Sequence, residues 1–305
     1  MSIDTPAERT LDDPDDTYSV SREATAGRAS IAPTYHADEG RYGGISARTR
    51  GLLTILHRAG SGPVRAADAA RLWNLDTRTA GRRLRMLAER GWLVRSGHGL
   101  YTLVPLDAET PSGWVEDPWL VVAKLYPTGY IGGWSACEHW GFTDQLFRDL
   151  LVFTPDRGAP RRAVTGVTPI RVKLIRPAKV FGVASVWRGT VKVNVSDPTR
   201  TIVDMLSDPT VGGGIRHTAE ALTAYLGSEH RDDGLLLAYI DRLGNRTVYK
   251  RLGYIAETLG IGGPALVAGC RARISRGVSL LDPAAEARGP IVTRWNLRIN
   301  VELDR

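Results

Sequence analysis

Cysteine and long apolar runs are scarce in this sequence of 305 residues. Its two cysteines, Cys137 and Cys270, lie far apart and form no CxxC pair, so neither a disulfide framework nor a cysteine-based zinc site is predicted. No stretch has the roughly 18 uninterrupted apolar residues that a membrane helix needs. The first residues, MSIDTPAERTLDDPDD, are acidic and polar, unlike a secretory signal or a transit peptide. We therefore expect a cytoplasmic protein with reduced thiols and no membrane partner.

Lysine is also scarce, and the charge is unevenly distributed. Of forty basic residues, only five are lysines. Residues 1–45 contain nine acidic residues against four arginines, a net charge of −5, whereas residues 46–104 contain eleven arginines against three acidic residues, a net charge of +8. A positive charge concentrated in one short region indicates a polyanionic partner. Abundant alanine and glycine also indicate a GC-rich genome, which accounts for part of the arginine excess.

The first 44 residues lack apolar periodicity and are rich in Asp, Ser, Thr and Ala. This composition predicts a largely disordered acidic tail. Two interpretations of the tail stay open. It is either a solvated extension or a segment that covers the basic region until DNA displaces it.

Residues 45–104 follow the element order of a winged helix-turn-helix. Apolar residues at helical spacing, with turn residues between them, predict three helices and then a hairpin. The predicted helices span residues 46–58, 65–73 and 77–90, and the predicted strands span residues 92–95 and 100–104. Asp76 is the expected N-cap of the third helix, because its carboxylate accepts a free backbone N–H of the first turn. Two glycines in the turn over residues 96–99 supply the backbone angles that a hairpin needs.

The rest of the chain predicts a linker and a second, larger domain. Residues 105–117 contain proline, glycine and acidic residues and are the expected linker. In the predicted domain at residues 118–305, helices are expected at 118–126, 134–141, 198–207, 215–226, 234–242 and 246–259, and strands at 150–154, 170–175, 184–187, 191–195 and 294–301. The expected fold class is therefore α+β, with an N-terminal winged helix-turn-helix followed by a larger mixed α/β C-terminal domain.

The third predicted helix separates an apolar face from a face of arginines. At about 100° per residue, its packing face contains Ala80, Leu84, Leu87 and Ala88. Arg78, Arg82 and Arg85 fall on the opposite side, and we name these three residues the arginine stripe. An arginine fork donates two hydrogen bonds to guanine O6 and N7 or grips a phosphate. We expect Arg78 and Arg82 to contact bases.

Further residues complete the candidate DNA-binding site. The expected contacts are Thr79 with a thymine methyl group or a phosphate, Arg83 and Arg85 with the DNA backbone, Arg95 and His98 from the hairpin, and Arg48 and Arg50 from the first helix. A solvated surface whose arginines reflect codon usage is the alternative to this interpretation.

The residues that carry this pattern also carry a family resemblance. The segment AADAARLWNLDTRTAGRRLRMLAERGWLVRSGHGLYTLVPL resembles the winged helix of the AbiEi family, the antitoxins of type IV abortive-infection toxin–antitoxin systems, and is most similar to mycobacterial members. YIGGWSACEHWGFTDQ resembles the Gly-Gly-x-Ser-Ala segment of that family. DPTRTIVDMLSDPTVGGGIRHTAEAL resembles its Arg-Thr-x-x-Asp-x-Leu segment. The resemblance covers roughly residues 45–230.

The resemblance implies two activities. Family members bind double-stranded DNA at inverted repeats in their own promoter through the winged helix and repress the operon. Their C-terminal domain counteracts a toxin with a nucleotidyltransferase-like fold, usually without a stable complex. Inverted repeats imply two copies of the chain on DNA.

The second domain lacks the residue patterns of an enzyme. Gly132 to Ser135 resembles the Gly-Ser turn of nucleotidyltransferases, but no Asp-x-Asp pair follows to hold magnesium. The glycines are better explained by close packing of Trp134, with Ser135 capping a helix. Neither HExxH nor a histidine–cysteine set at zinc spacing occurs. We expect no catalytic residues, no metal site and no cofactor.

Three features of the second domain leave alternatives open. A basic run (Arg157, Arg161, Arg162, Arg171, Lys173, Arg176 and Lys179) either extends a nucleic-acid footprint, touches the toxin or is a solvated surface. Asp204 either faces solvent or accepts a hydrogen bond from Arg200. The domain as a whole has two functional alternatives to an antitoxin, namely an enzyme that transfers phosphate or nucleotide to the toxin or a nucleic acid, and an effector sensor of a transcription factor without a toxin.

Overall fold

The computed structural model describes residues 45–60, 62–97, 99–105, 115–160, 162–165 and 168–303. Residues 48–305 form one compact unit. The predicted acidic tail, His98 and most of the predicted linker lie outside the described residues. The predicted domain boundaries at 104/105 and 117/118 stay a prediction. Within the described ranges, no helix combines the length and the apolar character needed to cross a membrane.

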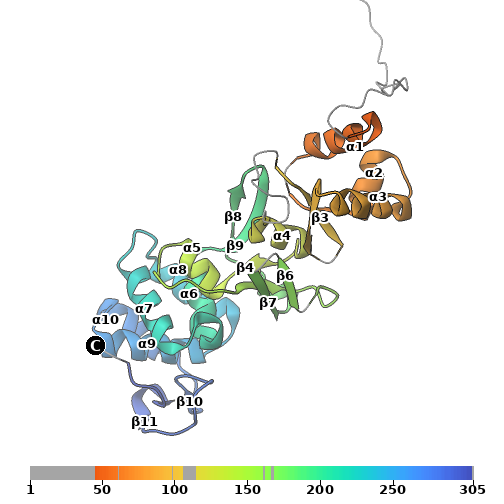
Figure 1. Ribbon diagram of the computed structural model, residues 1–305. Coiled ribbons are helices and arrows are strands. Elements are labelled where there is room, and N and C mark those ends of the chain that lie inside the picture. The colour runs from red at the N-terminus through yellow and green to blue at the C-terminus, as the bar shows by residue number, and fades with distance from the viewer. Residues whose placement is uncertain are drawn as a thin grey trace, which may run out of the picture. The chain divides into compact units, whose positions relative to one another are not determined.

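The N-terminal part has the predicted order of three helices and a hairpin (Figure 1). Its elements are α1 (Ala47–Arg58), β1 (Val64–Arg65), α2 (Ala66–Trp73), α3 (Thr77–Glu89), β2 (Leu93–Gly97) and β3 (Leu100–Leu103). The three strands form a small antiparallel sheet in the order β1-β3-β2. This is a winged helix-turn-helix, as the sequence predicts.

Local chemistry explains the turn between α2 and α3. Asn74 adopts a left-handed conformation with φ of 52° and ends α2, a conformation that asparagine tolerates better than most residues. Asp76 then accepts the backbone N–H of Thr79 at 2.8 Å and caps α3, which confirms the predicted N-cap. The Trp73 indole donates to the carbonyl of Leu52 at 3.1 Å and ties α2 to α1.

The hairpin is longer than predicted on its first strand. β2 continues past Arg95 to Gly97, with a register irregularity between these two residues. The buried hydroxyls of Ser96 and Thr102 lie 2.5 Å apart and hydrogen-bond across the strands. This pairing extends the β2–β3 ladder into residues that were predicted to form the turn because of their Ser, Gly and His composition.

The remaining chain forms a mixed sheet and a group of helices. The sheet has the order β6-β7-β5-β4-β9-β8, with β4 parallel to β9 and β5 parallel to β7. Its strands are β4 (Tyr130–Ile131), β5 (Leu150–Thr154), β6 (Arg162–Thr165), β7 (Thr168–Leu174), β8 (Val183–Arg188) and β9 (Val191–Ser196). The helices are α4 (Pro118–Leu125), α5 (Gly133–His139), α6 (Pro198–Ser207), α7 (Ile215–Leu226), α8 (Asp233–Leu243), α9 (Thr247–Leu259) and α10 (Gly263–Arg271).

Each face of the sheet is covered by apolar side chains. Val121 and Leu125 of α4 pack with Ile131, Val152 and Val195 on one face. On the other face, a second cluster contains Tyr130, Trp134, Leu151, Phe153 and Val211. Helices α6 to α10 surround a third cluster with the fully buried Trp295. The mixed α/β second part agrees with the predicted fold class.

The predicted final strand at residues 294–301 is wrong. A 3₁₀ turn occupies Thr293–Trp295 and only Leu297–Arg298 (β12) pairs, between β10 (Ser279–Leu280) and β11 (Ile291–Val292). Asn296 has a positive φ of 47°, which interrupts an extended chain. The Trp295 indole is fully buried against Gly253 and donates to Glu257 at 2.7 Å. Tertiary burial of one aromatic residue thus overrides the alternating pattern.

The winged helix packs on the second part through its hairpin and α2. Leu100, the first residue of β3, is fully buried in the cluster that contains Val121 of α4. Lys124 of α4 forms an ion pair with Asp68 of α2 at 2.6 Å. Arg65 donates to the carbonyl of Lys124 at 3.1 Å. The DNA-binding candidate is therefore held against the sheet rather than joined to it by the chain alone.

Candidate nucleic-acid interface

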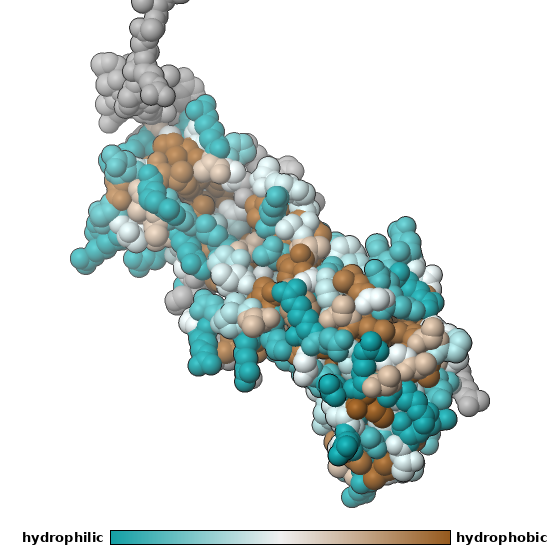
Figure 2. Space-filling view, turned by 180° about the vertical axis from the view of Figure 1, so that it is seen from behind, coloured by the Kyte–Doolittle hydropathy of each residue, from teal (hydrophilic) through white to brown (hydrophobic). Residues whose placement is uncertain are grey.

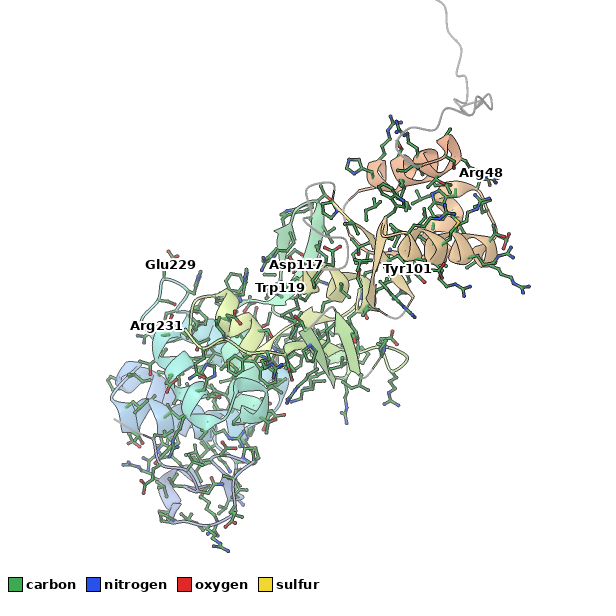
Figure 3. All side chains as sticks on the ribbon, viewed as in Figure 1. Arg48, Tyr101, Asp117, Trp119, Glu229 and Arg231 are labelled. Carbon is green, nitrogen blue, oxygen red and sulfur yellow. The ribbon has the colours of Figure 1, made fainter. Side chains whose placement is uncertain are left out.

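The arginine stripe is exposed on α3, opposite its packing face. Ala80, Leu84 and Leu87 are fully buried, whereas Arg78, Arg82 and Arg85 are all exposed. Long side chains project from the helices of the winged helix (Figure 3). Hydrophilic surface gathers around this part of the molecule in the space-filling view (Figure 2). The predicted division of α3 into a core face and an arginine face is therefore confirmed.

A second group of arginines lies beside the stripe. Arg83 is half-buried, and burial together with the positive charge of Arg48 lowers the pKa of its guanidinium. Arg48 is the second residue of α1 and is labelled on the winged helix in Figure 3. Two like charges held close together cost free energy that a phosphate between them would offset. Arg50 is also exposed.

The few acidic residues of the winged helix do not neutralise the stripe. Asp68 is occupied by Lys124 and Arg71, which together with the backbone N–H of Arg65 lower the pKa of its carboxyl against the effect of burial. Asp76 is used in the cap of α3. Glu89 stands at the far end of the helix. The positive charge of the arginine stripe is therefore available to a polyanion.

One contact within α3 was not predicted from the sequence. The Nη2 atom of Arg82 donates to the hydroxyl of Thr79 at 3.1 Å. Residues three apart on a helix are neighbours, so the spacing of Thr79 and Arg82 could have predicted this hydrogen bond. The prediction had given Thr79 a role on DNA alone.

The hairpin offers less free surface than a projecting wing. Arg95 is exposed on β2, opposite Tyr101. Leu100 and Gly97 lie against Val121 of α4, so one side of the hairpin end is covered by the second part. His98, the other predicted contact, lies outside the described residues.

The basic run of the second domain is partly occupied by internal partners. Arg171 forms an ion pair with Asp149, and Lys173 forms one with Asp208. Lys179 donates to the backbone carbonyl of Leu243. Arg157 and Arg176 are exposed, and the side chains of Arg161 and Arg162 lie outside the described part. These pairings reduce the charge that this run presents.

The Gly-Gly-x-Ser segment has a packing role. Gly133 has a φ of +55°, and a Cβ there would approach the Val211 carbonyl oxygen to 2.3 Å, so close packing requires glycine. The predicted helix cap at Ser135 is wrong, because Gly132 occupies the N-cap position. The Ser135 hydroxyl instead accepts the backbone N–H of Leu151 at 2.9 Å. A serine three residues into α5 is too late to satisfy the first free N–H groups of the helix.

Asp204 belongs to a buried network. Its carboxylate accepts from Nε of Arg200 and from the hydroxyl of Tyr130, both at 2.9 Å. Burial raises the pKa of Asp204, and Arg200 opposes that increase. The predicted hydrogen bond from Arg200 is confirmed, and the solvent-facing alternative is wrong. Among the described residues, no group of three or more His, Cys, Asp or Glu side chains is arranged to hold a metal ion.

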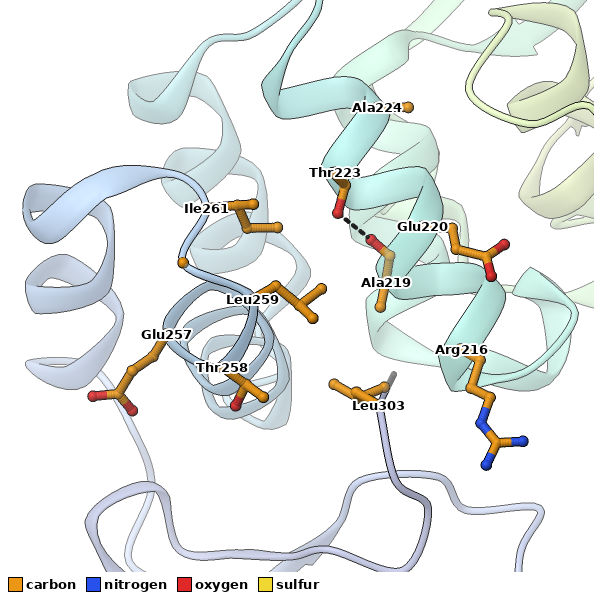
Figure 4. A pocket seen from close by; sticks show the side chains of 11 residues that line it. Arg216, Ala219, Glu220, Thr223, Ala224, Glu257, Thr258, Leu259, Ile261 and Leu303 are labelled. Carbon is orange, nitrogen blue, oxygen red and sulfur yellow. Dashed lines mark hydrogen bonds between the residues drawn. The ribbon is translucent and has the colours of Figure 1, made fainter. Parts of the chain in front are cut away.

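A cavity of about 870 Å³ lies between α7 and the end of α9 (Figure 4). Its apolar wall includes Ala219, Leu259, Ile261 and Leu303. The charged residues around it have internal partners. Nε of Arg216 donates to the Glu302 carbonyl at 3.0 Å, Glu257 pairs with Arg294 at 2.8 Å, and Glu220 accepts from Gln145 at 3.5 Å. This arrangement contains no nucleophile beside a general base in the described part of the chain.

Comparison with solved structures shows a similar fold in a known protein. The crystal structure of the RV2827C protein from Mycobacterium tuberculosis is similar with a TM-score of 0.59 over 81% of this chain and 89% of that chain, at 17% sequence identity. At this identity the likeness concerns the fold alone. No curated protein matched the sequence.

Comparison with family models identifies the winged helix. Residues 52–104 match the model of the transcriptional regulators described as AbiEi antitoxins. The matched range includes most of α1, all of α2 and α3, and both strands of the hairpin. It therefore includes the whole arginine stripe and its packing face. Over these residues, the chain is similar to the transcriptional regulators described as AbiEi antitoxins.

Proposed function

We propose that this protein is an antitoxin that represses its own promoter by placing α3 in the major groove at inverted repeats. The observation that carries the proposal is the arginine stripe, whose three exposed guanidinium groups lie opposite a fully buried packing face. A recognition helix needs this division, because one face must pack on α1 and α2 while the other meets base edges. The match of residues 52–104 to a family of transcriptional regulators supports this role of the helix.

The residues of α3 have different expected partners. Arg78 and Arg82 lie toward the N-terminal half of α3 and contact base edges, with guanine as the preferred base. Arg85 lies further along the helix and contacts phosphate. Arg83 and Arg48 grip one phosphate between them, which relieves their mutual repulsion.

The outer contacts hold the protein on the duplex. Arg50 is exposed on α1 near Arg48 and contacts the DNA backbone. From the hairpin, Arg95 reaches the adjacent phosphates, while the covered side around Leu100 does not enter a groove. His98 completes the proposed set of DNA contacts, and Thr79 takes part through its hydrogen bond with Arg82. Contacts of this kind fix the register of the protein and carry no sequence information by themselves.

Binding to the upstream region of its own gene tests the repressor proposal. The full chain should shift that duplex in a gel at low salt, and its affinity should fall steeply as salt rises, because each phosphate contact releases counterions. The double variant Arg78→Ala/Arg82→Ala should lose the preference for this duplex over unrelated DNA. Unchanged preference in the double variant would refute the assignment of α3.

The second half of the proposal concerns the toxin. We infer that residues 118–305 counteract a toxin with a nucleotidyltransferase-like fold, because the winged helix matches the model of the AbiEi antitoxins. The buried network of Arg200, Asp204 and Tyr130 supports a structural rather than catalytic use of the Arg-Thr-x-x-Asp segment, since each polar group has an internal partner.

Growth rescue tests whether DNA binding and toxin neutralisation are separate activities of the chain. Cells that express the product of the adjacent gene should be rescued by this protein and equally by its Arg78→Ala/Arg82→Ala variant. The full-length variant is preferable to a truncated chain, because Leu100 of the hairpin is part of the core beside α4. If the variant failed to rescue while it folded normally, DNA binding and neutralisation would not be separate activities.

A further inference from the structure

Arg82 and Arg78 of the stripe have the same guanidinium group but differ in whether a hydrogen bond restricts its position. Nη2 of Arg82 donates to Oγ1 of Thr79 at 3.1 Å. Arg78, about one turn earlier on α3, is also exposed. Within the described ranges its guanidinium has neither a hydrogen bond nor an ion pair to another side chain. One arginine is therefore held before DNA arrives, and the other is free.

The backbone of Thr79 is itself held by the cap of α3. The carboxylate of Asp76 accepts the backbone N–H of Thr79 at 2.8 Å. The Thr79 side chain is also the main cause of the lowered pKa of the Asp76 carboxyl. The lone pairs of the Thr79 hydroxyl are free to accept from Arg82, as the hydrogen bond to Nη2 shows. Arg82 is therefore linked to a residue whose backbone is held by the cap of α3.

We propose that Thr79 is a positioning residue that determines the base-pair specificity of Arg82. The proposal rests on the proposed function, because it requires α3 to lie in the major groove. Helical side chains lean toward the N-terminus of the helix, and the hydrogen bond to Thr79 holds the Arg82 guanidinium in that direction. The N-terminal residues of a recognition helix are the ones that contact base edges.

Pre-orientation favours the contact of Arg82 with a base. An arginine that is already ordered loses less rotamer freedom when it binds than one that is free. The hydrogen bond to Thr79 uses one N–H of the fork and leaves the others for the O6 and N7 atoms of a guanine. Arg78 has the same donors without this support. Thr79 thus acts on specificity through Arg82, rather than through its own contact with DNA.

Base-pair discrimination by the full chain tests the proposal. The wild-type protein first selects its preferred duplex from a pool of randomised duplexes. The dissociation constants of this duplex and of its single-base-pair substitutions are then measured for Arg82→Ala, Arg78→Ala, Thr79→Val and Thr79→Ser. Thr77→Val is the matched control, since the exposed hydroxyl of Thr77 has no partner among the described residues.

The expected result is a loss at one base pair. Thr79→Val should lower discrimination about threefold to tenfold at the position where Arg82→Ala removes it, part of the worth of a bidentate contact. The position that depends on Arg78 should not change. Thr79→Ser keeps the hydroxyl and should retain wild-type discrimination. Thr77→Val should behave as the wild type.

Other results would overturn the proposal in distinguishable ways. Wild-type discrimination in Thr79→Val would remove the positioning role, and so would an equal weakening on all duplexes, which would indicate a direct phosphate contact by Thr79. If the wild-type protein selected no sequence at all, the proposed function itself would fail. Circular dichroism checks the fold of each variant, and Thr79→Ala, with its higher helix propensity, replaces Thr79→Val if valine disturbs α3.

Discussion

The winged helix and the second domain use arginine in opposite ways. On α3, the three guanidinium groups of the arginine stripe are exposed, and the nearby acidic residues are occupied elsewhere. In the second domain, Arg200 is 1% exposed and pairs with Asp204. Arg251 is also buried there and donates to four backbone carbonyl oxygens. One residue type therefore presents charge to solvent in one region and cross-links the fold in the other.

This difference teaches that ion pairing within the fold, in addition to charge, separates the proposed DNA-binding face from the other basic surface. In the sequence, the basic run at residues 157–179 is a candidate nucleic-acid site, as the arginine stripe is. In the structure, Arg171 and Lys173 each have a carboxylate partner, while the guanidinium groups of the stripe have none among the described residues. Three variants would break or sharpen the comparison.

The largest effect is expected from Arg200→Ala. Removal of this guanidinium leaves Asp204 buried without its ion-pair partner and leaves the Phe181 carbonyl without a donor. Breaking a buried pair by removing one partner costs about 3–5 kcal/mol, so the free energy of unfolding in urea should fall by that amount. Arg171→Ala is the control, because its ion pair with Asp149 is two-thirds exposed on the arginine side and is worth at most about 1 kcal/mol. Equal stability of the two variants would contradict the structural role of Arg200.

An intermediate effect, on DNA affinity rather than stability, is expected from Arg82→Ala. Loss of one base-reading arginine should cost about 1–3 kcal/mol on the preferred duplex. The free energy of unfolding should change by no more than about 0.5 kcal/mol, because the side chain is exposed. Arg171→Ala should leave the affinity unchanged, which fluorescence anisotropy would measure. An equal loss of affinity in both variants would extend the DNA interface into the second domain.

The sequence predicted the winged helix well, because its signals are local. Helical spacing, the Asp76 cap and the glycines of the hairpin all act within a few residues. The division of α3 into buried Leu84 and exposed Arg82 follows from helical geometry alone. These are the features for which pattern and tertiary structure agree.

The second domain was predicted less well, because distant contacts decide it. Burial of Trp295 beside Gly253 replaced the expected strand at 294–301 with a turn. The helix at Gly263–Arg271 was not expected either, since it begins with Gly263 and Pro264. Whether a charged side chain such as Arg171 is free also depends on a partner more than twenty residues away. Spacing along the chain does not reveal such partners.

The smallest effect is expected from Glu116→Gln, and it concerns the free energy of unfolding. Glu116 is an acidic residue near the hairpin. Its carboxyl is buried close to Thr102 of β3; Oε1 accepts the backbone N–H of Asp117, and Oε2 has no hydrogen-bond partner among the described residues. Burial raises the pKa of Glu116, and the hydroxyl of Thr102 offsets part of the increase. At the start of α4, Asp117 and Trp119 follow directly (Figure 3).

A raised pKa in the folded state gives the pH dependence a definite sign. Below the ordinary pKa of glutamate, about 4.3, Glu116 is protonated in both the folded and the unfolded protein and costs nothing. As pH rises through the raised folded-state pKa, the unfolded state loses the proton more readily, so the free energy of unfolding falls. Glu116→Gln cannot ionise and should be more stable than the wild type near pH 7, by about 1 kcal/mol.

The measurement is urea unfolding of both proteins between pH 4 and pH 8. The stability difference should be small at the acidic end and should grow with pH, whereas a pH-independent difference would mean that the carboxyl does not ionise in this range. Because Glu116 lies beside the hairpin rather than on α3, the substitution should leave DNA affinity unchanged. A changed affinity would instead show that the packing of the hairpin on α4 influences how the arginine stripe meets DNA, and the two uses of charge in this chain would then be coupled through the junction around Leu100.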